Sequence, residues 1–115
     1  MAEDAAGALC YLVSHNTTNK DAIRKAGGVV PLVALLGAGA GSKVAENAAG
    51  ALRCLAFGNA TNKDAIREAG GIMPLVALLS AGAGSKVAVV SASALGALTN
   101  GNTTNKGTIL GARSL

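Results

Sequence analysis

The sequence predicts an all-α solenoid built from three-helix repeats with a period of 43 residues, and three observations lead to this prediction. Long segments recur at one constant offset, and proline and glycine stand at the same places in each copy. The hydrophobic half of the chain consists almost entirely of Ala, Leu, Val and Ile, with Tyr11 and Phe57 as its aromatic residues. Small side chains let helices pack closely. At 115 residues the chain is expected to form a single domain, residues 1–115.

The recurrence is visible in the sequence itself. NKDAIRKAGG at Asn19 recurs as NKDAIREAGG at Asn62, and AAGALCYL at Ala5 recurs as AAGALRCL at Ala48. A third register begins with ALGALTNGNTTNK at Ala94. A repeat of this length is typical of a helical solenoid, in which each unit buries its apolar face against its neighbours.

The first helix of each unit is predicted over TNKDAIREA. Thr61 is expected to cap its N-terminus, with Asp64 three positions on completing a capping box. Gly70 and Gly71 are expected to end it, because glycine accepts the left-handed conformation that follows many helices.

The second helix is predicted over the apolar run IMPLVALLS. Pro31 and Pro74 lie two residues inside the two copies of this run. Proline would remove a ladder hydrogen bond from a central strand, but it costs little in the first turn of a helix. The run is therefore interpreted as a helix.

The third helix is predicted to begin after Ser42 or Ser85 and to run through KVAENAAGALRCLAF in the first copy. Its apolar residues follow the three-and-four spacing of one buried helical face. They are Val44, Ala48, Ala51, Leu52 and Leu55.

The glycine-rich segment LLGAGAGSKV could also be a phosphate-binding loop between a strand and a helix. The GxxxxGK[ST] pattern needs Lys directly after its last glycine, but Ser42 separates Gly41 from Lys43. The GxGxxG pattern would need glycine at Ser42. The segment is interpreted as a joint between helices, and a nucleotide-binding α/β domain is the less favoured alternative. No cofactor is predicted, and ATP or NAD is not expected to stabilise the chain.

With these motifs the chain resembles the armadillo repeat family, of the glycine- and alanine-rich kind, as a partial array. The resemblance covers a third helix (1–15), two full repeats (16–58 and 59–101) and the first helix of another repeat (102–115). It implies a right-handed superhelix that binds a partner protein or an extended peptide along a concave surface formed by the third helices. It also implies a scaffold and not an enzyme.

The resemblance places the partner-binding surface on the third helices. Its candidate residues are Tyr11, Asn47, Gly50, Arg53, Cys54, Phe57, Val90, Ser93 and Asn100, with Asp4 and Ser14 flanking. Peptide-binding members carry a Trp and, four residues later, an Asn on this helix. Gly7, Gly50 and Ser93 occupy the Trp positions, and Tyr11, Cys54 and Ala97 occupy the Asn positions. Weak binding of Lys- and Arg-rich peptides is expected.

The remaining features exclude other classes of function. The net charge is +4, but no stretch clusters Lys and Arg as nucleic-acid sites do. The repeated lysines are instead expected to form an exposed, solvated basic edge; they are Lys20, Lys63 and Lys106, with Lys43 and Lys86. The uncharged stretch 87–105 contains too many polar residues to span a membrane. The acidic N-terminus does not match a secretory signal, which predicts an intracellular, cytoplasmic protein with the nucleus as an alternative.

Isolated reactive residues do not form a catalytic pattern. Cys10 and Cys54 match neither a disulfide framework nor a zinc site, so both are expected to be reduced thiols. His15 is expected in a joint, and Asn16, Asn59 and Asn102, although each begins an N-x-T sequon, are interpreted as turn residues. No combination of nucleophile, base and metal ligands recurs, so no enzymatic activity is predicted.

The ends of the array provide an alternative function. Leu9 and Leu12 belong to a third helix without its own first two helices, and Ile109 and Leu110 belong to a first helix without a second one. Such uncapped edges are expected to associate with a second copy, unless further repeats cover them. A structural, self-associating module is therefore kept beside the scaffold.

Overall fold

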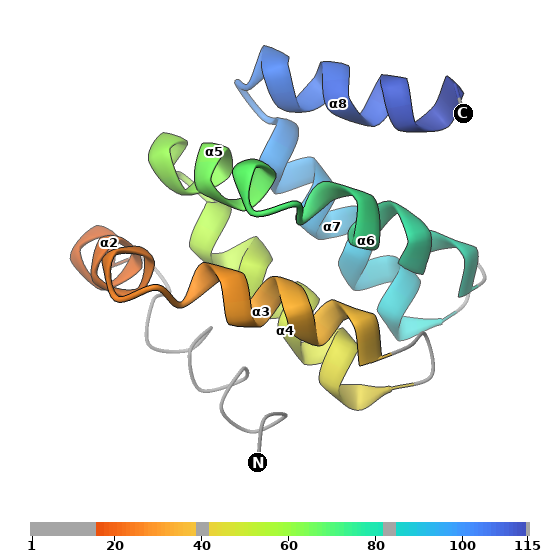
Figure 1. Ribbon diagram of the computed structural model, residues 1–115, viewed down its shortest axis with the longest axis horizontal. Helices are drawn as coiled ribbons and strands as arrows, with labels where there is room; N and C mark the ends of the chain where they lie inside the picture. The colour runs from red at the N-terminus through yellow and green to blue at the C-terminus, as the bar shows by residue number, and fades with distance from the viewer. Residues whose placement is uncertain (1–15, 39–41, 82–84, 115) are drawn as a thin grey trace.

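The computed structural model describes residues 16–38, 42–81 and 85–114, and every regular element in these ranges is helical (Figure 1). The predicted all-α class is confirmed there. The first unit contains α2 (Thr17–Lys25), α3 (Val29–Leu35) with the 3₁₀ turn η1 (Leu36–Ala38), and α4 (Lys43–Ala56). The second contains α5 (Ala60–Glu68), α6 (Ile72–Leu78) with η2 (Leu79–Ala81), and α7 (Lys86–Thr99), and α8 (Thr103–Ser114) follows.

The first helices begin at an asparagine, which corrects the predicted cap. The side chain of Asn59 accepts a hydrogen bond from the backbone N–H of Asn62 at 2.9 Å, and Asn16 caps α2 in the same way. Thr61 lies inside α5, and Asp64 bonds to other side chains instead of closing a capping box. Asparagine is as good a cap as threonine or better, so the sequence permitted both registers.

Glycine ends these helices, as predicted. Gly70 has φ +81°, and its N–H donates to the carbonyl of Arg67 while the N–H of Gly71 donates to that of Ile66. Gly71 is required for a different reason: a Cβ there would lie 2.7 Å from Ile66 Cγ2 and 3.1 Å from the Ile66 carbonyl oxygen. The two glycines therefore make a sharp turn and a close approach, respectively.

The second helices confirm the interpretation of the proline-containing runs. Pro31 and Pro74 lie in the first turns of α3 and α6, where no intrahelical N–H is lost. Because the run before the glycine-rich segment is α3 and not a strand, the strand–loop–helix geometry of a nucleotide-binding loop does not form at this place.

The third helices are the longest paired elements, and serines cap both of them as predicted. Ser42 accepts from the N–H groups of Val44 and Ala45, and Ser85 accepts from that of Ala88. The predicted buried face of α4 is correct for four of its five residues, Ala48, Ala51, Leu52 and Leu55, whereas Val44 is half-buried. Ala45, Ala49 and Ala56 are buried as well, so α4 is covered on more than one side.

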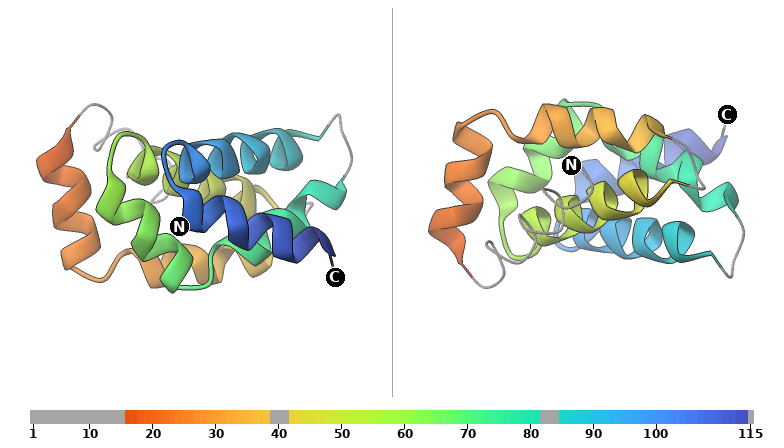
Figure 2. Two further views of the ribbon diagram at one scale, coloured as in Figure 1. Left: turned by 90° about the horizontal axis from the view of Figure 1, so that it is seen from above. Right: turned by 90° about the horizontal axis from the view of Figure 1, so that it is seen from below.

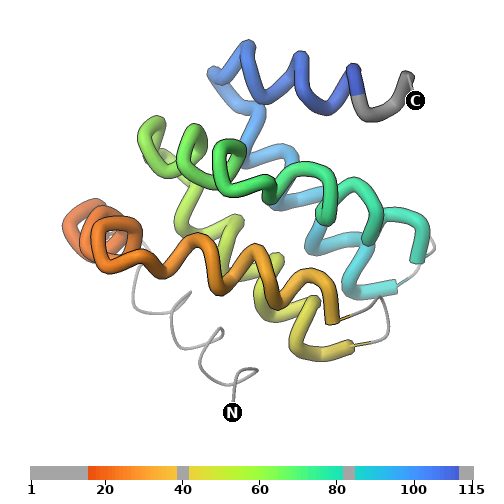
Figure 3. Tube along the Cα trace, in the orientation of Figure 1, coloured from red at the N-terminus to blue at the C-terminus, as the bar shows by residue number. Residues whose placement is uncertain are grey.

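The helices stack in corresponding layers. Figures 1 and 3 show α3 and α6 in front of α4 and α7, and Figure 2 shows the two units side by side. The third helices α4 and α7 pack along their length, and the first helices α2, α5 and α8 contact one another in turn. The core between these layers is aliphatic, with Leu52, Leu55, Ile66, Leu75 and Leu98 completely buried. Each such side chain contributes about 1.5–3 kcal/mol through burial.

The predicted partial repeat 1–15 lies outside the described residues, as do Leu9, Cys10, Tyr11, Leu12 and His15. The division of the chain into two full and two partial repeats stays a prediction.

Candidate functional site

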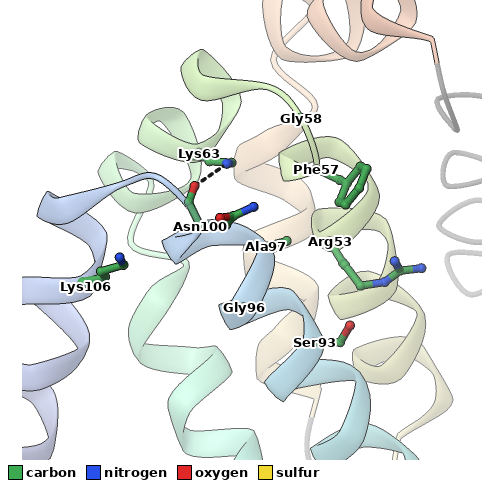
Figure 4. Close-up of a pocket in the computed structure, with 9 residues that line it drawn as sticks. All are labelled: Arg53, Phe57, Gly58, Lys63, Ser93, Gly96, Ala97, Asn100 and Lys106. Carbon is green, nitrogen blue, oxygen red and sulfur yellow. Dashed lines mark hydrogen bonds between the residues drawn. The ribbon is translucent and has the colours of Figure 1, made fainter.

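A pocket of about 520 Å³ lies where the C-terminal ends of α4 and α7 meet the first helices that follow them (Figure 4). Four helices contribute to it. Its lining residues are Arg53, Phe57, Gly58, Lys63, Ser93, Gly96, Ala97, Asn100 and Lys106, and we call it the third-helix pocket.

Four of the predicted partner-binding residues meet in this pocket: Arg53 and Phe57 from α4 and its cap, and Ser93 and Asn100 from α7 and its cap. Phe57 is 57% exposed, so an aromatic face is available to a partner.

Three other predicted residues lie outside the third-helix pocket, toward the N-terminal parts of the same two helices. Gly50 lies opposite Val90, because a Cβ at Gly50 would be 3.8 Å from Val90 Cγ1. Asn47 is half-buried on α4. Tyr11 lies outside the described residues.

Cys54 corrects one expectation. It is disulfide-bonded, so the predicted reduced thiol is wrong at this position, and Cys10, the other cysteine of the chain, lies outside the described residues. Cys54 is also only 9% exposed. Its sulfur accepts a weak hydrogen bond from Arg53 Nη2 at 3.7 Å, which holds the guanidinium beside α4.

The lysine column is not the uniformly exposed edge that the sequence predicted. Lys20 is buried, donates to the carbonyl of Phe57, and lies 5.6 Å from the centre of the Phe57 ring. Burial lowers the pKa of Lys20. Lys63 is half-buried and donates to the carbonyl of Asn100 at 2.6 Å, and Lys106 is exposed. Lysine at this position therefore satisfies the free carbonyls at the end of the third helix in both units.

The sequence did not place Lys63, Lys106, Gly58, Gly96 or Ala97 in the site. The repeating lysine column was visible, but its meaning depends on the fold, because α5 and α8 bring their lysines to the ends of α4 and α7. The small residues Gly96 and Ala97 create the hollow, and nothing in their local sequence distinguishes them from the other small residues of α7.

The site's electrostatics follow from where the carboxylates are. Asp21 pairs with Arg24 at 3.0 Å, Asp64 with Arg67 at 3.0 Å, and Glu46 with Lys43 at 3.3 Å. None of these paired residues lines the third-helix pocket, and none of the described residues that line it is acidic. In the described part of the chain, the pocket thus has three cationic side chains and no anionic one.

The structure offers few alternatives to a binding role. Within residues 16–38, 42–81 and 85–114, no three His, Cys, Asp or Glu side chains converge in a way that could hold a metal ion. None of the helices in those ranges is both long enough and apolar enough to cross a bilayer.

Taken together, paired three-helix units and a shared surface along their third helices define a helical repeat protein. Residues 16–57 match the family model described as Armadillo/beta-catenin-like repeat. The chain therefore contains an armadillo repeat over residues 16–57. No curated protein matches it. Repeats of this family typically bind proteins and are typically not enzymes.

Proposed function

We propose that this chain is a protein-interaction scaffold that binds a partner protein or an extended peptide along the surface of its third helices. The scaffold is a right-handed, glycine- and alanine-rich armadillo array with the 43-residue period, acting as one domain without catalysis, cofactor or nucleic acid. The proposed contact residues remain Tyr11, Asn47, Gly50, Arg53, Cys54, Phe57, Val90, Ser93 and Asn100. We assign the protein to the cytoplasm, with the nucleus as the alternative.

The observation that carries this proposal is the third-helix pocket. It gathers residues from α4, α5, α7 and α8, so its shape depends on the stacking of two units. Its lining combines an exposed aromatic ring with polar and cationic groups, a composition that favours a protein surface as its ligand.

The test is affinity capture from the source cell with a bulky, uncharged substitution in the site. Ser93→Trp fills the pocket from an exposed position on α7, and Ala34→Trp places the same side chain at an exposed position on α3 as a matched control. Both variants must first show the helical spectrum and melting temperature of the wild type.

The proposal predicts that a specific partner is retained by the wild type and by Ala34→Trp, and that its affinity falls at least about tenfold in Ser93→Trp, as for a blocked interface centre. Equal retention by both tryptophan variants, or a loss only in Ala34→Trp, would contradict the assignment to this surface.

A second function has an observation of its own. An open hollow of about 390 Å³ between α7 and α8 is lined mainly by apolar atoms, including those of Leu95, Ile109 and Leu110, and Leu110 is 61% exposed. We propose a second copy of this chain as its occupant, with Leu9 and Leu12 on the opposing edge.

Light scattering across a concentration series tests this self-association. The measured mass should rise with concentration in the wild type, whereas Leu110→Glu should keep the mass of a monomer. Val30→Glu places the same charge at an exposed site on α3 and should associate like the wild type. A wild type that remains monomeric at high concentration would refute the second function.

A further inference from the structure

We infer that the third-helix pocket binds an acidic segment of the partner, an extended peptide that carries Asp or Glu side chains. This inference rests on the proposed function and adds the chemical class of its ligand. Three observations support it: the pocket gathers cations without a described carboxylate, these cations have unused hydrogen-bond donors, and the rest of the lining suits a peptide.

The cations of this pocket lie together where none of the described lining residues is a carboxylate, whereas three other cations of the described chain are paired. Arg24, Lys43 and Arg67 each form an ion pair with a carboxylate three residues away in sequence. Arg53 and Lys106 form no ion pair among the described residues, and Arg53 donates only to the sulfur of Cys54. The pocket gathers three cationic side chains in one place, so a partner carboxylate would supply the charge that its described lining lacks.

The pocket also offers unused hydrogen-bond donors. An ammonium group has three N–H donors, and Lys63 uses one of them on the carbonyl of Asn100 (Figure 4). The guanidinium of Arg53 has five donors in a planar fork that suits a carboxylate. Lys106 and Arg53 lie on either side of Asn100 in Figure 4, so an extended segment crossing the end of α7 would meet both.

The rest of the lining favours a peptide over a nucleic acid. Phe57 is the one aromatic residue among the described residues that line the pocket, and Gly96 and Ala97 provide a small apolar floor next to the cations. Single-stranded nucleic acids are held by several aromatic side chains on which successive bases stack. One ring beside an apolar floor instead suits an aliphatic side chain flanked by acidic ones.

The experiment uses fluorescence anisotropy with three labelled peptides of the same length. The first alternates glutamate with leucine and serine, the second replaces each glutamate by glutamine, and the third replaces it by lysine. Single-stranded DNA of the same charge as the first peptide is the fourth probe. We expect only the glutamate peptide to bind tightly, with an affinity that falls as the salt concentration rises.

Matched variants locate the site. Arg53→Gln and Lys106→Gln each remove one pocket cation, and each should weaken the glutamate peptide about five- to tenfold, as expected for a charge-assisted hydrogen bond. Lys86→Gln removes the same charge from an exposed position at the start of α7, outside the pocket, and should change the affinity less than about twofold.

The outcomes separate this inference from the function on which it rests. Equal binding of the glutamate and glutamine peptides, equal effects of Lys86→Gln and Lys106→Gln, or tighter binding of the DNA would each overturn the acidic ligand. If the captured partner is blocked by Ser93→Trp but is insensitive to Arg53→Gln and Lys106→Gln, the scaffold stands and this inference fails. If no captured partner responds to Ser93→Trp, the proposed function itself fails.

Discussion

Arg24 donates a hydrogen bond from its guanidinium to the side-chain oxygen of Asn62 at 2.9 Å, and this bond joins the first helices of two successive units. Asn62 has no exposed surface, and its amide nitrogen donates to the carbonyls of Leu55 and Lys20. Arg67 and Asn105 repeat the arrangement between α5 and α8 at 3.1 Å. The units are therefore registered by buried polar contacts as well as by apolar packing, because each buried amide is satisfied only when its neighbour is in place.

Replacing the buried amide should destabilise the whole array. Asn62→Ala leaves the carbonyl of Leu55 without this donor and removes the acceptor of Arg24, so we expect a loss of about 2–4 kcal/mol in the free energy of unfolding. Urea denaturation followed by circular dichroism measures it. A loss below about 1 kcal/mol would contradict a registering role for Asn62.

The corrected helix cap gives a second prediction. Asn59→Ala removes the cap of α5 and the hydrogen bond to Asp21, and it should cost about 1–2 kcal/mol. Thr61→Ala, at an exposed position inside the same helix, should change stability by less than about 0.5 kcal/mol. Urea denaturation compares the stabilities of the two variants. A larger loss in Thr61→Ala than in Asn59→Ala would show that Thr61 is the cap.

The carboxylates of the first helices predict how stability depends on pH. The hydrogen bond from Asn59 lowers the pKa of Asp21 below its ordinary value of 3.8, and the one from Asn102 lowers that of Asp64. The neighbouring Arg24 and Arg67 act in the same direction, and desolvation opposes both shifts. Because the pKa of each group is lower in the folded state, each stabilises the fold above its unfolded pKa, and this contribution is lost as the pH falls through the lower folded value.

Urea denaturation between about pH 5 and pH 2 tests this dependence. The double variant Asp21→Asn, Asp64→Asn should lose less stability on acidification than the wild type, since its side chains do not take up a proton. Glu68→Gln, which removes an exposed carboxylate from α5, is the control and should follow the wild type. Identical pH profiles for the double variant and the wild type would show that these contacts do not persist in solution.

Ser91 gives a prediction of increased stability. Its hydroxyl is completely buried in α7 without a hydrogen-bond partner among the described residues, and the equivalent position in α4 is Ala48, also buried. Ser91→Ala should raise the free energy of unfolding by about 0.5–1.5 kcal/mol, because an unsatisfied buried hydroxyl is removed. The reciprocal Ala48→Ser should lower it. Thermal and urea unfolding measure both, and a destabilised Ser91→Ala would mean that the hydroxyl has a partner in solution.

Much of the fold could be predicted because its signals are local. Pro74 in a first helical turn, Gly70 after a helix and Ser42 before one each act within a few residues, so the sequence reveals them directly. Neighbouring residues alone could not show whether Asn59 or Thr61 is the cap, because Asn59 also donates a hydrogen bond to Asp21 in the preceding unit. Tertiary contact decided between two acceptable caps.

The candidate site was less predictable, for the same reason. Arg53 and Phe57 could be assigned from their helix and the family resemblance, but Lys63 and Lys106 enter the third-helix pocket only through the stacking of α5 and α8. Lys20 is the clearest example of a residue whose position could not be predicted from the sequence. A lysine that repeats on a polar helix reads as exposed, yet its ammonium is buried against a helix end where it donates to a carbonyl.

Site-specific photo-crosslinking tests the central claim, that the third helices carry the partner-binding surface. A benzophenone amino acid replaces Ala97 in the third-helix pocket or, as the control, Ala34 at an exposed position of α3, and each protein is irradiated with the partner captured by the wild type. The account predicts a covalent adduct with the partner from position 97 and none from position 34. An adduct from position 34 with none from position 97 would contradict it.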